Sequence, residues 1–242
     1  MTVLTIAIPT YNRVEYLKEL LPELLEQCKP YPGIEVLVSD NGTTDGTFPY
    51  LLSLADNLQL QYRANETNLG ADTNFIQCVE SAKGDYVWLF GDDDLLSPHG
   101  IENVVKTISR YYPRLIITGI PGQKGTYLNY RAVIKDKDPS FIIDHTLITC
   151  NIFKRELFNK QIAYDRMSTR YGLMYAIMDS LMDNGPVYIL NKPVFTIREN
   201  RPPFNGPPKW MRLKHIQYLL YLGVPLPQIL GYYYQMIRRK LL

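Results

Sequence analysis

Residues 82–94 read Ala82-Lys-Gly-Asp-Tyr-Val-Trp-Leu-Phe-Gly-Asp-Asp-Asp94, an apolar run that leads directly into three adjacent carboxylates. The apolar part, residues 85–90, has the length and composition of a buried parallel strand. Similar runs occupy residues 3–8, 34–38, 58–62 and 114–119, and expected helices separate them at residues 13–27, 47–55 and about 74–82. Strands that alternate with helices predict an α/β fold, in which a mostly parallel, Rossmann-like sheet is flanked by helices.

The polar segments that follow these strands predict one ligand site. They are Thr10–Arg13, Asp40-Asn41, Asn68–Gly70 and Gly91–Asp94. In open parallel sheets, ligands bind beyond the carboxyl ends of the strands. We therefore expect the four segments to converge at that edge of the sheet.

The three carboxylates are the strongest signal in the chain. Adjacent carboxylates repel one another, which raises their pKa values unless a cation or hydrogen-bond donors compensate. Mg²⁺ or Mn²⁺ is the natural counter-charge, because both take oxygen ligands, and either ion would in turn hold a diphosphate. The alternative is an N-terminal helix cap, which needs only one aspartate. The pattern therefore favours a metal site.

The other polar segments suit a nucleotide. Asp40 can accept a hydrogen bond from a ribose hydroxyl or a base imino group, which is compatible with an Asx turn opening the next loop. Tyr11 can stack on a base while its segment caps the first helix, and the segment from Asn68 either caps a helix or touches the nucleotide. The chain has no G-x-G-x-x-G and no P-loop, which argues against dinucleotide cofactors and nucleoside triphosphate hydrolysis.

The composition excludes several classes of protein. Lys and Arg number 26 and Asp and Glu 24, a balance that argues against a general nucleic-acid partner. Three scattered cysteines and three scattered histidines make no zinc pattern, and reduced, cytosolic thiols are the simplest interpretation.

The tail differs in charge from the body. After Glu199 there are seven basic residues and no acidic one, so the tail carries +7 and the first 199 residues −5. Residues 201–208 predict a Pro-rich linker. The uncharged stretch 216–237 is broken by Pro and Gly, which predicts two short amphipathic helices rather than a membrane span.

A basic, aromatic tail predicts docking on an anionic membrane surface. The expected apolar face is Leu219, Leu220, Leu222, Leu226, Ile229 and Leu230, with rings from Trp210, Tyr218, Tyr221 and Tyr232–Tyr234 at headgroup depth. The alternatives are packing on the body or a homodimer through the tail helices. The first residues lack a signal-peptide pattern, so we expect a cytoplasmic protein that lies peripherally on the inner face of the cytoplasmic membrane.

Taken together, the motifs resemble glycosyltransferase family 2. The resemblance lies in Ile6–Arg13, Val38–Thr47, Asn68–Gly70 with Asn74, and Ala82–Asp94, and it covers roughly the first 120 residues. It implies a GT-A fold and an enzyme that inverts the anomeric carbon of a nucleoside-diphosphate sugar with the help of Mg²⁺ or Mn²⁺.

The resemblance also implies roles for individual residues. Base and ribose would be held by Pro9, Thr10, Tyr11 and Asp40, with Asn12, Asn41 and Asn68 beside them. Asp92 would lie by the ribose and diphosphate, and Asp93 would be the metal ligand, with Asp94 as second candidate. Arg198 follows the last expected strand, residues 194–197, at a point where family members often place a basic residue near the diphosphate. A surface ion pair is its alternative role.

The general base is harder to place, because the chain departs from the family pattern. The usual Glu-Asp pair stands about a dozen residues before a Gly, here Gly185, and the matching window 170–174 has no carboxylate. Asp165, expected in a polar loop that could face the acceptor, is the preferred substitute. Asp179, expected within a helix, is the second choice and Glu156 a weaker one.

These inferences predict residues 1–200 as a GT-A catalytic domain, with 1–120 binding the nucleotide sugar and 121–200 the acceptor. Residues 201–242 form the linker and a small helical extension. The expected function is a metal-dependent inverting transfer of sugar to a glycan or lipid-linked glycan, in bacterial O-antigen or capsule synthesis. The alternatives are a sugar nucleotidyltransferase, which normally needs a Gly- and Arg/Lys-rich loop after the first strand, and an inactive nucleotide-sugar-binding module.

Overall fold

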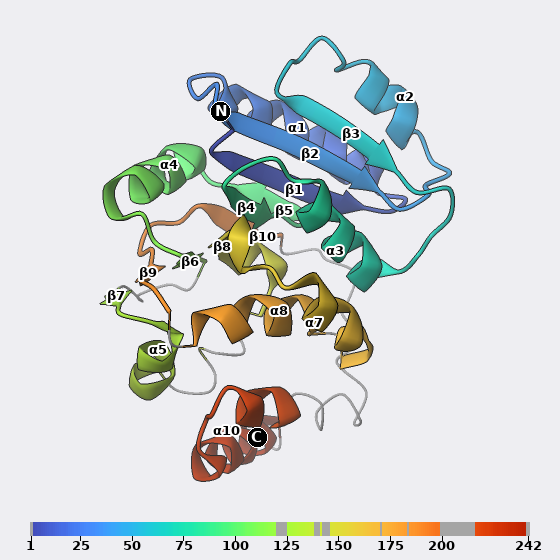
Figure 1. Cartoon of the computed structure of the whole chain (residues 1–242). Coiled ribbons are helices and arrows are strands. Elements are labelled where there is room, and N and C mark those ends of the chain that lie inside the picture. The colour runs from blue at the N-terminus through green and yellow to red at the C-terminus, as the bar shows by residue number, and fades with distance from the viewer. Residues whose placement is uncertain are drawn as a thin grey trace.

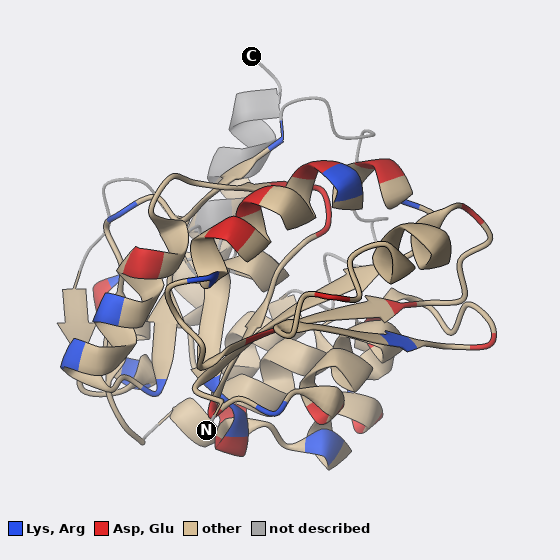
Figure 2. Cartoon of the chain, turned by 90° about the horizontal axis from the view of Figure 1, so that it is seen from above, with Lys and Arg blue, Asp and Glu red and all other residues tan. Residues whose placement is uncertain are grey.

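A mixed sheet flanked by helices on both faces forms the body of the protein in the computed structural model (Figure 1). The structure describes residues 2–119, 125–137, 141, 146–169, 171–182, 184–198 and 216–240. Within them the main sheet has eight strands in the order β3-β2-β1-β4-β8-β6-β9-β7. Charged residues of both signs are intermixed over the described elements in the view of Figure 2.

The first half of the sheet is parallel. It contains β1 (Leu4–Thr10), β2 (Ile34–Asp40), β3 (Leu60–Ala64) and β4 (Tyr86–Leu89). The register pairs Thr10 with Asp40, so the carboxyl ends of β1 and β2 lie side by side. The helices of this half are α1 (Val14–Cys28), α2 (Thr47–Leu52), α3 (Ala71–Ser81) and α4 (Gly100–Tyr111). The alternation read from the sequence is confirmed here.

The second half of the sheet is mostly antiparallel. Its strands are β6 (Leu115–Ile117), β7 (Gly125–Tyr127), β8 (Asn151–Lys154) and β9 (Val187–Ile189). Strand β8 runs antiparallel to both β4 and β6 and so joins the two halves. The helices here are α5 (Tyr130–Asp136), α7 (Lys160–Asp165) and α8 (Gly172–Leu181).

A separate two-stranded sheet pairs β5 (Asp94–Leu96) with β10 (Phe195–Ile197). The antiparallel register sets Ile197 opposite Asp94, so the end of β10 lies beside the carboxylate cluster. A strand, not a helix, therefore begins within the cluster, and α4 starts only at Gly100. The helix-cap alternative for these aspartates is wrong for that reason.

The C-terminal helices are part of the hydrophobic core. A helical turn spans residues 216–221, and α10 (Leu226–Lys240) follows it. Tyr218 is fully buried, with its ring stacked on Tyr171 at 5.4 Å. The other buried residues of this segment include Leu219, Leu222 and Ile229.

This packing corrects the expected membrane face. Tyr218, Leu219, Leu222 and Ile229 face the core, because the body offers them an apolar surface. Leu220, Leu226 and Leu230 remain 46–57% exposed. Trp210 and the linker 201–208 lie outside the described residues. In the part of the chain that the structure describes, no helix is both long and apolar enough to cross a membrane.

The burial of Leu222 leads to a stability prediction. Leu222 is 1% exposed, so Leu222→Ala should lower the free energy of unfolding by about 2–5 kcal/mol, through lost apolar contacts and the cavity left behind. Leu226 is 50% exposed, and Leu226→Ala should change the free energy of unfolding by less than about 0.5 kcal/mol. Urea unfolding of both variants checks this. Equal, small effects would show that the tail is not part of the core.

Candidate active site

A pocket of about 390 Å³ opens at the carboxyl ends of β1, β2 and β4. Its volume is in the range of sites that bind small ligands. It is lined by Pro9, Thr10, Tyr11, Arg13, Asn41, Asn68, Gly70, Ala71, Asn74, Phe75, Gly91, Asp92, Asp93 and Ile148. Residues from all four predicted polar segments therefore meet here, as the sheet topology requires.

Asp92 sits at the base of this pocket and is only 4% exposed. Its Oδ2 accepts a hydrogen bond from the Thr10 hydroxyl at 2.8 Å, and its Oδ1 accepts one from Arg13 Nη1, also at 2.8 Å. Burial raises the pKa of Asp92, while Arg13 and Thr10 act in the opposite direction. Asp92 is thus a buried carboxylate held by two protein donors.

Asp93 and Asp94 converge on one small space above Gly91. A methyl group built on Gly91 would lie 3.2 Å from Asp93 Oδ1 and 2.9 Å from Asp94 Oδ2, so glycine keeps this space open. Thr149 links Asp94 to Gly91, because its hydroxyl donates to Asp94 Oδ2 at 2.5 Å and accepts from the Gly91 amide at 2.9 Å. Asp93 lines the pocket, whereas Asp94 is buried at its back.

This donor set fits a hard divalent cation. Two carboxylate oxygens face one space, and Mg²⁺ is typically held by one or two carboxylates together with substrate phosphates and water. No group of three or more His, Cys, Asp or Glu side chains with metal-site geometry occurs among the described residues. A cation here would therefore depend on the substrate for part of its coordination.

Asp40 and Asn12 lie beside the pocket but do not line it. Asp40 forms the Asx turn, with its Oδ1 accepting from the Thr43 amide at 2.9 Å and its Oδ2 from the Tyr62 hydroxyl at 3.1 Å. Burial, together with the Asp40 charge, raises the pKa of Tyr62 to about 12. Asn12 has a positive φ of 50° and accepts a hydrogen bond from the Thr44 amide at 2.9 Å. Both residues therefore hold the backbone of the loop at residues 43–44, next to the pocket.

An asparagine network forms the wall on the β2 side. Asn41 Nδ2 donates to Asn68 Oδ1 at 2.8 Å, and Asn41 Oδ1 accepts from Asn65 at 3.0 Å. Asn68 Oδ1 also accepts from the Gly70 amide at 2.8 Å, just before α3 begins. Asn68 thus orders the turn before α3 and lines the pocket, but α3 has no side-chain cap, so the capping role predicted for this segment is wrong.

The backbone of Arg198 follows the strand that pairs with Asp94, but its side chain forms an ion pair elsewhere. It follows Ile197, the partner of Asp94, but its Nη1 pairs with Glu19 at 2.6 Å and its guanidinium lies 5.0 Å from the Tyr16 ring centre. Its Nε and Nη2 are buried without a hydrogen-bond partner. The ion-pair role predicted as the alternative is realised, with Glu19 as the acid.

None of the three candidate bases lines the pocket. Asp165 is the last residue of α7 rather than part of a loop, and it accepts a hydrogen bond from Gln161 at 2.9 Å, one turn earlier. Asp179 is in α8, as expected, and accepts from the Tyr221 hydroxyl of the tail. Glu156 pairs with Arg114 at 3.3 Å.

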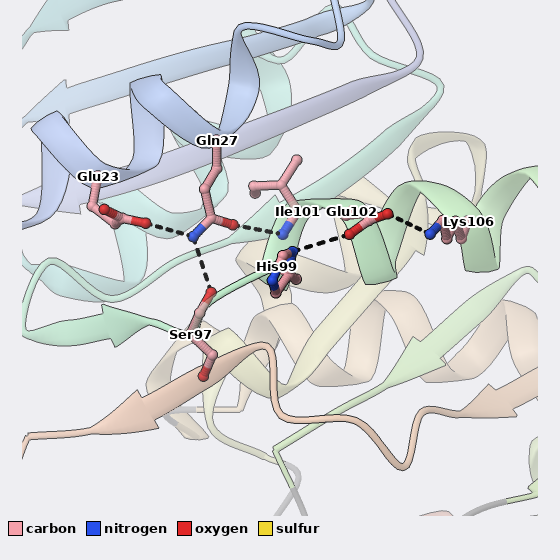
Figure 3. A network of polar contacts seen from close by, with 7 residues as sticks. All are labelled: Glu23, Gln27, Ser97, His99, Ile101, Glu102 and Lys106. Atoms are coloured by element: carbon pink, nitrogen blue, oxygen red, sulfur yellow. Dashed lines mark hydrogen bonds and ion pairs between the residues drawn. The ribbon is translucent and has the colours of Figure 1, made fainter.

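Gln27 on α1 anchors the chain that leaves the cluster, as Figure 3 shows. Its Nε2 donates to the Ser97 carbonyl at 3.0 Å, and its Oε1 accepts from the Ile101 amide at 3.2 Å. The segment between β5 and α4 is therefore held against α1.

Several pocket residues escaped prediction as ligand contacts: Arg13, Ala71, Phe75 and Ile148. Arg13 is the only basic residue in the four predicted polar segments, so it could have been identified as a counter-charge for the three carboxylates. Phe75 and Ile148 carry no comparable signal, because an apolar residue in a site has the same pattern as one in a core.

Comparison with known proteins places the chain in a family. The family model described as glycosyl transferase family 2 matches residues 5–179, which is more than half of the chain. This protein therefore belongs to glycosyl transferase family 2. The abequosyltransferase RfbV of Salmonella typhimurium is 46% identical over 96 residues, which are 39% of this chain and 29% of the relative.

Solved structures agree on the fold. The Staphylococcus aureus TarS 1–349 complex with UDP-GlcNAc superposes with a TM-score of 0.67 at 17% identity, covering 90% of this chain and 67% of that one. Glucosyl-3-phosphoglycerate synthase from Mycobacterium tuberculosis, in complex with Mn²⁺, UDP and glucosyl-3-phosphoglycerate, gives 0.55 at 14% identity, covering 93% and 81%. The GT-A fold is confirmed. The chain spans about a third of the length of the curated relatives, 29% for the abequosyltransferase and 35% for TarS.

Proposed function

We propose that this protein is a metal-dependent, inverting glycosyltransferase that uses a nucleoside-diphosphate sugar. The single observation that carries the proposal is the pocket in which Asp92 and Asp93 meet Thr10, Tyr11 and Asn68 at the carboxyl edge of the sheet. Membership of glycosyl transferase family 2 and a GT-A fold support it. The donor's diphosphate belongs at the carboxylates, and its base and ribose toward Tyr11 and the Asp40 turn.

In the proposed reaction, an acceptor hydroxyl attacks the anomeric carbon from the face opposite the diphosphate, while a carboxylate takes its proton. Asp93, with Asp94 as second candidate, would hold Mn²⁺ or Mg²⁺, which would neutralise charge on the departing diphosphate. Asp92 positions the ribose and diphosphate. Thr10 and Arg13 hold Asp92 in place through their hydrogen bonds.

For the proton acceptor we propose Asp165. It precedes residues 167–169, and Met167 Sδ accepts a hydrogen bond from the Thr73 hydroxyl at 3.5 Å. Thr73 directly precedes Asn74 and Phe75 of the pocket, so residues 167–169 contact α3 next to the pocket, and we propose that the acceptor enters on this side. Asp179 is less suitable, because its partner is Tyr221 of the tail, whereas the partner of Asp165 is Gln161 of its own helix, next to the segment that contacts α3.

The proposed setting is bacterial surface-polysaccharide synthesis, with a glycan or lipid-linked glycan as acceptor. It is supported by the activities of two relatives, an abequosyltransferase and a poly(ribitol-phosphate) β-N-acetylglucosaminyltransferase. A sugar nucleotidyltransferase is disfavoured by the family match and by the absence of a Gly- and Arg/Lys-rich loop at Thr10–Arg13. An inactive binding module has the same pocket and differs from the enzyme only in turnover.

The function is tested by incubating the protein with a panel of UDP-, GDP-, CDP- and dTDP-sugars, Mn²⁺ and lipid extract, and measuring release of the nucleoside diphosphate. The proposal expects one donor to be consumed and inversion of the anomeric carbon in the product. Binding of a donor without release under every acceptor condition would favour the inactive module.

We further propose that the tail docks on anionic membrane through α10. Leu226, Leu230 and Tyr234 recur at intervals of four residues on one face of the helix and are 50–67% exposed. The chain after Glu199 has basic residues and no acidic ones. Apolar side chains beside basic charges are the pattern of helices that lie in the interface of anionic membranes.

Removing the exposed face should weaken membrane binding without unfolding the core. The double variant Leu226→Ser, Leu230→Ser should reduce co-sedimentation with phosphatidylglycerol vesicles by about tenfold, because two apolar side chains no longer enter the membrane. Leu58→Ser, at a position 94% exposed elsewhere, is the matched control. Unchanged binding of the double variant, or a change in oligomeric state instead, would contradict docking and favour a dimer.

A further inference from the structure

Arg13 links α1 to the carboxylate cluster. Its Nη1 lies 2.8 Å from Asp92 Oδ1 and 3.4 Å from Asp93 Oδ2. The side chain lines the pocket and is 38% exposed. Within the described residues, only Nη1 of its guanidinium makes a hydrogen bond to protein, so the N–H groups of Nε and Nη2 are available to a ligand.

The guanidinium also contacts an aromatic ring. Its central carbon lies 5.7 Å from the ring centre of Tyr16, one turn into α1. Arg198 lies 5.0 Å from the same ring centre and is paired with Glu19. An aromatic ring attracts cations, so Tyr16 helps to fix two arginines near the site. Arg13 is therefore a pre-positioned cation.

A fixed positive charge at this position has two opposite effects. It repels any cation that Asp93 binds, because a hard divalent ion would lie about 2.0–2.1 Å from that carboxylate. It attracts an anionic diphosphate, and a guanidinium can bind phosphate oxygens with two parallel N–H groups. Because Arg13 contacts Asp93 and also has N–H groups available to a ligand, it can both repel a cation at Asp93 and bind a diphosphate beside it.

We propose that Arg13 is a positioning residue with two tasks at the donor site. Before the donor binds, it is the counter-charge of Asp92 and Asp93 and keeps the affinity for a lone divalent cation low. When the donor binds, its Nε and Nη2 groups bind the diphosphate, while Nη1 stays on Asp92. The inference rests on the proposed function, because it assumes a nucleoside diphosphate as ligand.

The test is calorimetric titration of the wild type and Arg13→Gln with Mn²⁺ alone and with UDP, GDP, CDP and dTDP. Arg13→Gln should bind Mn²⁺ alone about threefold or more tightly, because a nearby positive charge is gone. It should bind the preferred nucleoside diphosphate in Mn²⁺ about 10- to 100-fold more weakly, because charge-assisted hydrogen bonds are lost. If Arg13→Gln only damaged the fold, it would weaken both the Mn²⁺ affinity and the nucleoside-diphosphate affinity.

Two further variants keep the result decisive. Arg13→Lys retains the charge, so it should match the wild type in Mn²⁺ affinity and still lose diphosphate affinity. Arg110→Gln removes the same charge from α4, where Arg110 lies 5.3 Å from the Tyr111 ring and outside the pocket, and it should change neither affinity. Parallel losses, or an unchanged diphosphate affinity in Arg13→Gln, would overturn the inference. A wild type that binds no nucleoside diphosphate in Mn²⁺ would instead overturn the proposed function.

Discussion

Asp93→Ala is expected to lower kcat/KM by about 10³-fold or more and to remove the metal dependence of nucleotide binding, with little change in the free energy of unfolding. Asp93 lines the pocket and shares with Asp94 the space above Gly91. Without it, a cation loses the ligand that faces the diphosphate, and the charge that develops on the leaving group is no longer neutralised.

The fold should survive this change, because Arg13 keeps its 2.8 Å contact with Asp92. Asp93→Asn retains the shape of the side chain but loses its charge, so it should lower kcat/KM almost as much as Asp93→Ala. Glu26→Ala, on the exposed face of α1, is the control and should leave activity unchanged. An Asp93→Ala protein that binds nucleotide with the metal dependence of the wild type would exclude Asp93 as the ligand.

The second large effect is expected at the proposed base. Asp165→Asn should lower kcat by about 10²- to 10⁴-fold, as loss of a general base typically does, and leave the affinity for the donor within about twofold. Asp165 is outside the donor pocket, so its loss should not disturb the diphosphate. Single-turnover kinetics together with donor titration separate the two quantities.

Asp179→Asn is the matched control for that experiment. Asp179 is also an exposed helical acid, but its partner is Tyr221 of the tail. We expect near-normal turnover in this variant. Loss of turnover in Asp179→Asn with normal turnover in Asp165→Asn would assign the base to Asp179 instead.

Much of the donor half could be predicted because its signals are local. Strands such as Leu4–Thr10 and Ile34–Asp40 are continuous apolar runs, and the polar residues that follow each run must meet at one edge of a parallel sheet. Seven of the predicted site residues line the pocket: Pro9, Thr10, Tyr11, Asn41, Asn68, Asp92 and Asp93.

Features that depend on distant contacts were missed. Strand β5 is only three residues long and pairs with β10 about a hundred positions later, so it has no pattern of its own, although the strand expected at residues 194–197 contains β10. Thr149 reaches Asp94 across 55 positions of the chain, and nothing in the sequence around Thr149 indicates this contact. Asp165 was expected in a loop because α7 is only six residues long and has weak periodicity.

The C-terminal segment 216–240 shows that an amphipathic pattern does not reveal which surface covers the apolar face of a helix. Leu222 and Leu226 have the same chemistry and lie four positions apart, yet one is 1% and the other 50% exposed. Apolar residues on a helix predict only that some surface covers them. The body covers one face, and the proposed membrane contact uses the other.

The central claim is that donor binding requires a divalent cation at this carboxylate cluster. Its most direct test is the thermal midpoint of the wild-type protein with a panel of nucleotide sugars, in Mn²⁺ and in EDTA. A ligand at a hundred times its Kd should stabilise the fold by about 2.7 kcal/mol, or roughly 5–10 °C in Tm. We expect this rise in Tm for one nucleotide class in Mn²⁺ and a much smaller rise in EDTA. Equal rises in Mn²⁺ and EDTA, or none with any nucleotide sugar, would contradict it.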